Sequence, residues 1–234
     1  PLLSCTSSNN VDFARIQERK TNVITQLREG VKGLLSTPGI TYREGEAKFI
    51  DKKIIEVNGT QMTADNIIIA TGSHARLLPF IPAFNTPEGE ALKNKVLTST
   101  ELLDIDHVPQ TMAIIGAGVI GLELASAFET FGSKVTVIEF LKECLPSIDS
   151  DIAKRLRKTL EKRGINFNMN SGVKSIVATE DKKQAIVTFE QKGQEKKVIA
   201  DIVLVATGRA ANIEGLGLEI AGINCIKQGI ETNE

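Results

Sequence analysis

The residues best suited to chemistry form a glycine-rich run, Gly116-Ala117-Gly118-Val119-Ile120-Gly121. The run directly follows the apolar residues 112–115 and directly precedes an apolar helical pattern, which is the context that a dinucleotide-binding turn requires. There the first glycine makes a tight turn, the second lets the backbone approach a pyrophosphate, and the third lets helix and strand pack closely. The free amide groups and positive dipole end of the helix favour that doubly charged ligand. The run predicts a dinucleotide site, and the alternative is a strand-to-helix packing turn without a ligand.

A carboxylate stands where such a site places its ribose-binding acid. Glu139 ends the apolar run 134–138, roughly 20 residues beyond the glycines. A carboxylate there accepts both hydroxyl hydrogens of an adenosine ribose and repels a 2′-phosphate. The nearest following cations, Lys142 and Arg155, are not adjacent to it, so the sequence offers no clamp for that phosphate. The pattern favours NAD over NADP, and the alternative is an ordinary surface charge at the end of a strand.

Four further residues have side chains that could act in a site. Glu123 lies within the apolar helical residues 122–128, and its carboxylate either points to solvent or reaches the crevice beside the cofactor; spacing alone leaves both interpretations open. Cys144 follows Glu139 in a loop and is interpreted as a free thiol. His74 and His107 lie in loop-like sequence and show no catalytic pattern, so surface positions are expected for both.

Composition limits the class of protein. The chain has 234 residues, 41% hydrophobic and 24% charged, enough for one large domain or two small ones. Its 28 basic and 29 acidic residues leave a net charge of −1, without an electrostatic footprint for nucleic acid or an anionic membrane. No spanning segment or secretion signal is recognised. We expect a cytoplasmic chain with small-molecule or protein partners and no metal site. The cysteines are too few and too far apart for a disulfide scaffold: Cys5, Cys144 and Cys225.

The first part of the chain predicts a helix followed by short strands. Apolar positions in residues 11–35 recur at spacings of three, four and seven, which is typical of a long amphipathic helix. A continuous apolar run at residues 66–72 predicts a strand buried on both faces, and the proline-rich residues 79–90 predict a linker or surface loop. Between helix and strand, three short runs predict an antiparallel meander: 40–43, 47–50 and 54–57.

The second part alternates strands and helices. This order predicts a Rossmann-like α/β unit, a parallel sheet with right-handed crossovers and helices on both faces. One internal repeat is visible, since residues 68–73 and 204–209 share the pattern Ala-Thr-Gly after an apolar run. The expected strands are 112–115, 134–139, 167–169, 173–177, a hairpin of 185–189 with 197–200, and 202–208; the expected helices are 122–131 and 149–163.

On these motifs the chain resembles the pyridine-nucleotide disulfide oxidoreductases, a family of flavoproteins, and within it the dihydrolipoamide dehydrogenases. The resemblance extends over nearly the whole chain and implies electron flow from a dihydrolipoyl dithiol, through a cysteine pair and FAD, to NAD. It implies a partial FAD-binding domain at 1–96, an NAD-binding domain at 97–220, and the return to the FAD domain at 221–234. The residues that carry it are 116–123, 134–140, the two Ala-Thr-Gly turns, 17–20, 30–35, 67–73, 108–109, 208–209 and 215–218.

The resemblance also assigns roles to residues. It implies that residues 116–121 hold the NAD pyrophosphate, that Glu139 binds the adenosine ribose, and that Glu123 approaches the nicotinamide. For the remaining positions it implies a nucleotide-lining role for Val173 and Gly208, a flavin-contacting turn for Thr71, Gly72 and Ser73, and a backbone approach to the adenine end of FAD for Ala47.

Several family features are missing from these residues. The first glycine motif for FAD, a Cys-x4-Cys pair, a Gly-Asp flavin motif and an interface domain with a His-Glu pair are not present, and residues 209–212 depart from the usual Arg-Arg-Pro-Asn. We therefore expect a central fragment without catalytic residues of its own, inactive alone and with an incomplete FAD site. Its parent is expected to be a homodimer that acts on a dihydrolipoyl-bearing protein. The alternatives are an NADH-dependent flavoprotein reductase or oxidase without a redox dithiol, and a free-standing NAD-binding module.

Overall fold

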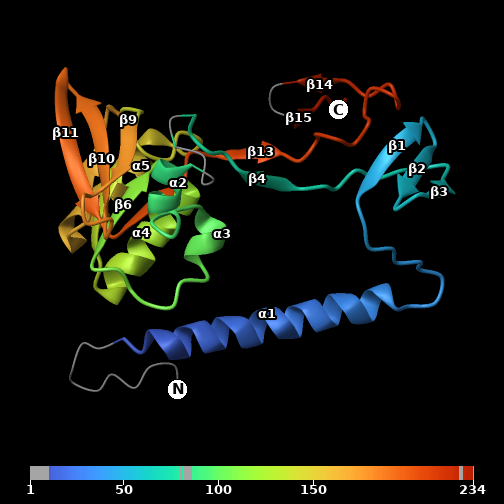
Figure 1. The fold of residues 1–234 in the computed structure, drawn as a ribbon, viewed down its shortest axis with the longest axis horizontal. Helices are drawn as coiled ribbons and strands as arrows, with labels where there is room; N and C mark the ends of the chain where they lie inside the picture. Colours follow the sequence, from blue (N-terminus) through green and yellow to red (C-terminus); the bar gives the residue numbers. More distant parts are fainter. Residues whose placement is uncertain (1–10, 80, 82–85, 227–228, 234) are drawn as a thin grey trace. The chain divides into compact units, whose positions relative to one another are not determined.

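The computed structural model describes residues 11–79, 81, 86–226 and 229–233 (Figure 1). The chain divides into two compact units. The larger unit holds residues 75–208 together with the chain up to residue 18, and the smaller unit holds residues 19–74 and 209–234.

The larger unit is built on a five-stranded sheet in which all neighbouring strands are parallel. The predicted parallel α/β architecture is therefore confirmed. The strand that precedes the glycine run, β6, lies in the middle of the sheet, between β12 and β7. In spatial order the strands are β5 (Val96–Leu97), β12 (Ile202–Val205), β6 (Thr111–Ile115), β7 (Lys134–Ile138) and β8 (Asn166–Asn168).

Helices cover one face of this sheet. Successive residues of a strand point to opposite faces, and on β6 Met112 and Ile114 enter a core cluster that also contains Leu122, Phe128 and Leu160. Asp149 caps the last of these helices, and glycines with positive φ, Gly132 and Gly164, end the two long ones, as their sequence pattern predicts. The helices on this side are α3 (Ser99–Leu102), α4 (Val119–Phe131) and α5 (Ser150–Arg163).

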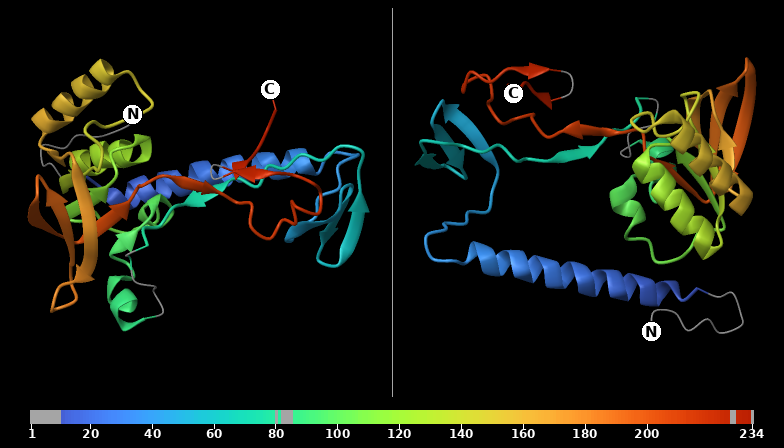
Figure 2. Two further views of the ribbon diagram at one scale, coloured as in Figure 1. Left: turned by 90° about the horizontal axis from the view of Figure 1, so that it is seen from above. Right: turned by 180° about the vertical axis from the view of Figure 1, so that it is seen from behind.

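A second sheet, not a layer of helices, covers most of the opposite face (Figure 2). Ala113 and Ile115 of β6 pack into a separate core cluster with Ile176, Val187 and Phe189. The expectation of helices on both faces was wrong, because residues 171–200 pair as extended antiparallel strands whose residues alternate between the two faces. The expected hairpin within this segment is confirmed. The elements on this side are β9 (Ser171–Ala178), β10 (Ala185–Gln191), β11 (Gln194–Ala200) and the short helix α2 (Pro87–Leu92).

In the smaller unit the antiparallel meander is confirmed with one strand shifted. Asn58 and Gly59 both have positive φ, 49° and 77°, the geometry of a two-residue hairpin turn. This turn pairs the second strand with residues 60–63, and the expected strand at 40–43 does not form. The strands are β1 (Ala47–Asp51), β2 (Ile54–Val57) and β3 (Thr60–Thr63).

Helix α1 (Phe13–Leu35) is present as predicted, but it is poorly covered. Phe13, within the larger unit, packs against Phe128 and Phe131. It is the only buried residue of the helix, so the amphipathic pattern of the sequence has no counterpart on most of its length among the described residues.

The predicted buried strand at residues 66–72 does not form. Ile68 is 91% exposed, although the apolar run suggested burial on both faces. Such runs belong to strands with parallel neighbours on each side, and in the described part of the chain no strand pairs with these residues. The apolar run is present in the sequence, but no element among the described residues buries it.

The Ala-Thr-Gly repeat predicted from the sequence makes the same bond twice. The Thr71 hydroxyl donates to the carbonyl oxygen of Asn212 at 2.7 Å, and the Thr207 hydroxyl donates to that of Arg76 at 3.1 Å. Each acceptor stands five residues after the threonine of the other copy, so the two copies make equivalent hydrogen bonds. The repeats lead into the paired strands β4 (Ser73–Ala75) and β13 (Arg209–Ala211), and the chain continues to β14 (Cys225–Ile226) and β15 (Gly229–Ile230).

Candidate nucleotide-binding site

The glycine run forms the turn between β6 and α4, and two of its glycines are required by the chain's own packing. Gly116 has φ +106°, and a Cβ there would overlap the carbonyl oxygen of Ala206. A Cβ on Gly121 would overlap the carbonyl oxygen of Gly116. These two positions would demand glycine in any protein with this turn, whether or not a ligand binds.

Gly118 is different, because nothing in the chain requires it to be glycine. Its backbone has φ −76° and ψ −175°, an extended conformation open to any residue, and a Cβ placed there would have no atom within 4 Å. The space in front of Gly118 is therefore left empty by the protein itself. Such open space at the start of a helix is compatible with the close approach of a pyrophosphate.

The N-terminus of α4 lacks the cap that the other long helix of this unit has. Asp149 accepts hydrogen bonds from the amides of Asp151 and Ile152 at the start of α5. At the start of α4 the N-cap is Gly118, which has no side chain, and no side-chain cap is formed. The first amide groups of a helix have no partner within it, so the start of α4 is suited to an external anion.

Glu139 lies beside this turn, as its spacing predicts. One carboxylate oxygen accepts from the amide of Ala117 at 2.5 Å and the other from the amide of Leu141 at 2.7 Å. The parallel register aligns Ile115 with Ile138, which brings the residue after β7 to the same edge as the glycine turn. The structure thus joins the two strongest sequence signals in one place.

The remaining residues of the predicted NAD site lie at different depths. Gly208 is exposed, has φ +109°, and follows β12, whose Val205 is in register with Ile115 at the same edge of the sheet. Val173 lies on β9, half-buried against the second core cluster. Glu123 is exposed on α4, so its carboxylate is open to solvent or to a ligand.

The residues predicted to touch FAD lie in the smaller unit. Ala47 is an exposed residue of β1, paired with Val57. In the turn at residues 71–73, the Asn212 side-chain amide donates to the carbonyl oxygen of Thr71 at 2.9 Å, and Arg209 donates to the Ser73 hydroxyl at 2.7 Å. Gly72 has φ +72°. Among the described residues, no hydrogen bond joins Ala47 to this turn.

Asn212 was missed as an organising residue by the sequence reasoning. The carbonyl oxygen of Asn212 accepts from Thr71, and the backbone amide of Asn212 donates to the carbonyl oxygen of Gly72 at 3.0 Å. The side-chain oxygen of Asn212 lies 2.6 Å from Nδ1 of His74. The internal repeat was the available signal, since Asn212 follows the second Ala-Thr-Gly by the distance at which Arg76 follows the first.

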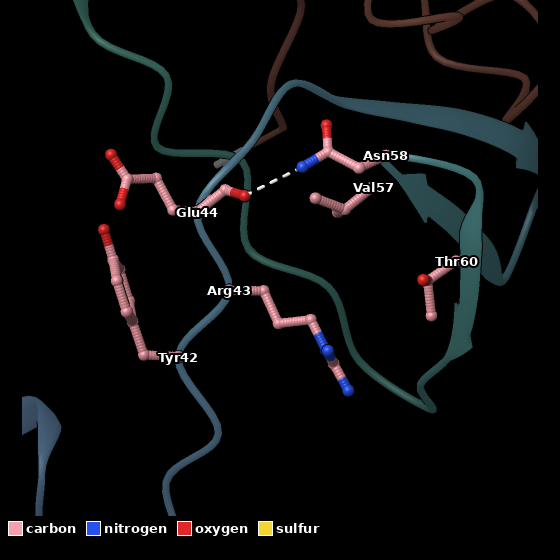
Figure 3. Close-up of a pocket in the computed structure, with 6 residues that line it drawn as sticks. All are labelled: Tyr42, Arg43, Glu44, Val57, Asn58 and Thr60. Carbon is pink, nitrogen blue, oxygen red and sulfur yellow. Dashed lines mark hydrogen bonds between the residues drawn. The ribbon is translucent and has the colours of Figure 1, made fainter.

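A polar hollow in the smaller unit stands apart from the predicted sites. It has a volume of about 250 Å³, and the side-chain amide of Asn58 donates to the backbone oxygen of Glu44 at its rim, as Figure 3 shows. None of the predicted site residues lines it. Its lining is Tyr42, Arg43, Glu44, Val57, Asn58 and Thr60.

Cys144 has the environment of a structural thiol. It is buried, and burial raises the pKa of its thiol to about 11, so the reactive thiolate is scarce at neutral pH. The neighbouring Glu143 is held by two hydrogen bonds from Arg157, which keep the pKa of its carboxyl at about 2.

Within the described residues, no group of three or more metal-ligating side chains gathers. No described helix is both long and apolar enough to cross a membrane.

The chain is similar to known oxidoreductases. It is 37% identical over 224 residues to a dihydrolipoyl dehydrogenase of Geobacillus stearothermophilus, covering 94% of this chain and 45% of the relative. It is 36% identical over 231 residues to a mercuric reductase of Staphylococcus aureus, covering 98% of this chain and 40% of the relative. The chain thus spans about half, or less, of the length of these relatives.

A solved structure shows the same fold. The HOCl-induced flavoprotein disulfide reductase RclA from Escherichia coli matches with a TM-score of 0.80 and 32% identity, covering 94% of this chain and 48% of that one. The family described as pyridine nucleotide-disulphide oxidoreductase matches residues 1–234. With the parallel sheet, the glycine turn and the strand-end carboxylate in place, the chain belongs to the pyridine nucleotide-disulphide oxidoreductase family.

Proposed function

We propose that the larger unit binds NAD, with the pyrophosphate at the glycine turn and the adenosine ribose at Glu139. The observation that carries this proposal is the empty space at Gly118, because packing accounts for Gly116 and Gly121 but not for a glycine at 118. The uncapped start of α4 supports it independently, since it offers amide donors to an anion.

The preference for NAD over NADP is part of the proposal. An ionised carboxylate only accepts hydrogen bonds, so Glu139 suits the two ribose hydroxyls of NAD and repels the 2′-phosphate of NADP. Its place beside the turn, held by the amides of Ala117 and Leu141, supports this role. Val173 and Gly208 belong to the same proposal as residues that line the nucleotide, and Glu123 belongs to it as the residue that approaches the nicotinamide.

The parent protein is proposed to be a dihydrolipoyl dehydrogenase that oxidises a dihydrolipoyl dithiol and reduces NAD. When bound, NAD would serve as the hydride acceptor. The Geobacillus relative supports this substrate. The part played by the described residues is to bind and orient the nucleotide, while the turn at residues 71–73 and Ala47 would contribute to an FAD site completed elsewhere. We further propose a homodimeric, cytoplasmic parent; the exposed free thiol of Cys225 fits a reducing compartment.

A related reductase with another substrate is the second candidate. Relatives named mercuric reductase and flavoprotein disulfide reductase match the same length of chain at similar identity. This favours a nucleotide-binding segment shared among several activities, with the choice of substrate made by residues outside it.

Calorimetric titration of the 234-residue chain with NAD and NADP tests the proposal. NAD should bind more tightly, and Glu139→Ala should reduce the difference. Asp149→Ala, which removes a cap from another helix of the same unit, is the matched control and should keep the preference. Equal affinities for the two nucleotides in the unaltered chain would contradict the ribose assignment.

A further inference from the structure

Phe140 is an exposed aromatic side chain in a chain whose other described phenylalanines are covered. It is 76% exposed, whereas the described phenylalanines at the other positions are buried or half-buried. It directly follows Glu139 at the carboxyl edge of the parallel sheet. An aromatic ring left in water at this edge calls for a physical reason, because exposure forfeits the favourable burial of apolar surface.

The backbone on both sides of Phe140 is fixed. The carbonyl oxygen of Glu139 accepts from the amide of Ser171 at 2.8 Å, and that of Leu141 accepts from the amide of Asn170 at 3.0 Å. The carboxylate of Glu139 also holds the Leu141 amide. The ring is therefore presented from a well-held backbone, not from a loose loop.

One edge of the ring faces a glycine. A Cβ added at Gly172 would lie at ordinary contact distance, 3.7 and 3.8 Å, from Cδ2 and Cε2 of Phe140, so the ring edge lies over Gly172 at the start of β9. Leu141 and Val119 are also exposed. Exposed apolar side chains thus flank both the strand-end carboxylate and the first turn of α4.

The position of Phe140 relative to Glu139 suggests its ligand. If Glu139 binds the adenosine ribose, the adenine bonded to that ribose must lie next to this carboxylate, within reach of the neighbouring side chains. Adenine is a flat aromatic ring, and bases stack readily on aromatic side chains. We propose that Phe140 is the adenine-contacting residue of this site and contributes to nucleotide affinity by stacking; this inference rests on the proposed NAD-binding function.

The chain offers a direct optical test, because it contains no tryptophan. Phe140→Trp introduces a single reporter at the proposed contact. ADP-ribose and NAD should quench its fluorescence, whereas nicotinamide mononucleotide, which lacks adenine, should not. The matched control is Tyr42→Trp, an aromatic replacement at a 62% exposed position of the smaller unit, whose fluorescence should not respond to any of the three.

Calorimetry separates the inference from the function on which it rests. Phe140→Ala should lower the affinity for NAD and for ADP-ribose by about ten-fold or more, as expected for the loss of one stacked base, and leave the far-ultraviolet circular dichroism unchanged. NAD binding to the unaltered chain with no loss in Phe140→Ala and no quenching in Phe140→Trp would overturn the inference alone. No NAD binding to the unaltered chain would overturn the proposed function and this inference with it.

Discussion

The two units differ in how completely they bury their own apolar surface. Both core clusters lie within the larger unit, on the two faces of one parallel sheet. In the smaller unit the buried apolar side chains among the described residues are Phe49, Val57 and Leu218, while Leu27 and Ile68 are exposed. The comparison teaches that the larger unit carries its own core, whereas the apolar pattern of the smaller unit is mostly left exposed among the described residues.

The largest expected difference between the units is the cost of removing an apolar side chain. Ile114 is fully buried on β6. Its replacement by alanine should lower the free energy of unfolding by about 3 kcal/mol, because apolar burial is lost and a cavity is left behind. Leu27 is 66% exposed on α1, and its replacement by alanine should lower the free energy of unfolding by less than about 0.5 kcal/mol. Urea denaturation measures both, and equal losses would erase the proposed contrast.

The second expectation concerns backbone protection. Amides of β6 and β12 should exchange only through opening that approaches global unfolding, whereas those of residues 66–72 should exchange with opening free energies near zero. Hydrogen exchange followed by mass spectrometry on a dilute sample checks this. Slow exchange of residues 66–72 would mean that they are paired and that the smaller unit is better ordered than its burial indicates.

The third expectation is a pH dependence confined to the larger unit. The Arg157 guanidinium lowers the pKa of Glu143 to about 2, so this carboxylate stabilises the fold above its unfolded pKa. The stabilisation is lost as pH falls from about 4.5 towards 2. After allowance for solvent screening it should amount to about 1 kcal/mol.

Glu143→Gln should remove this part of the acid destabilisation in denaturation curves taken from pH 5 to pH 2.5. Leu27→Ala, which alters no ionisable group, is the control and should leave the pH profile unchanged. A profile unaffected by Glu143→Gln would show that the ion pair contributes nothing to stability.

The sequence predicted the larger unit well because its signals are local. The strand, glycine turn and helix around residues 111–131 are contiguous, and Glu139 follows at the spacing that a parallel pair dictates. The strands at 171–200 were largely expected, but their place over the second face was missed, because which surface a sheet packs against depends on contacts distant in sequence that no local spacing reveals. The strand expected at residues 66–72 was wrong for the opposite reason, since the local apolar pattern is present but no strand among the described residues pairs with it.

Phe140 could not have been selected from the sequence, because it is one of nine phenylalanines and only its exposure distinguishes it. Gly118 was selected from the glycine motif, with a role expected to differ from those of Gly116 and Gly121. The structure adds the physical reason, since a Cβ would clash with backbone at Gly116 and Gly121 but would meet open space at Gly118.

The most direct test of this account is replacement of Gly118 by aspartate, followed by thermal unfolding and calorimetric titration with NAD. Aspartate at this position caps α4 as Asp149 caps α5, so stability should stay within about 1 kcal/mol of the unaltered chain or rise. The side chain fills the space intended for the pyrophosphate and repels it, so NAD binding should be lost. Gly118→Asn provides the uncharged control, and Gly121→Ala should instead destabilise the fold. A stable Gly118→Asp chain that binds NAD as tightly as the unaltered one would contradict the central claim.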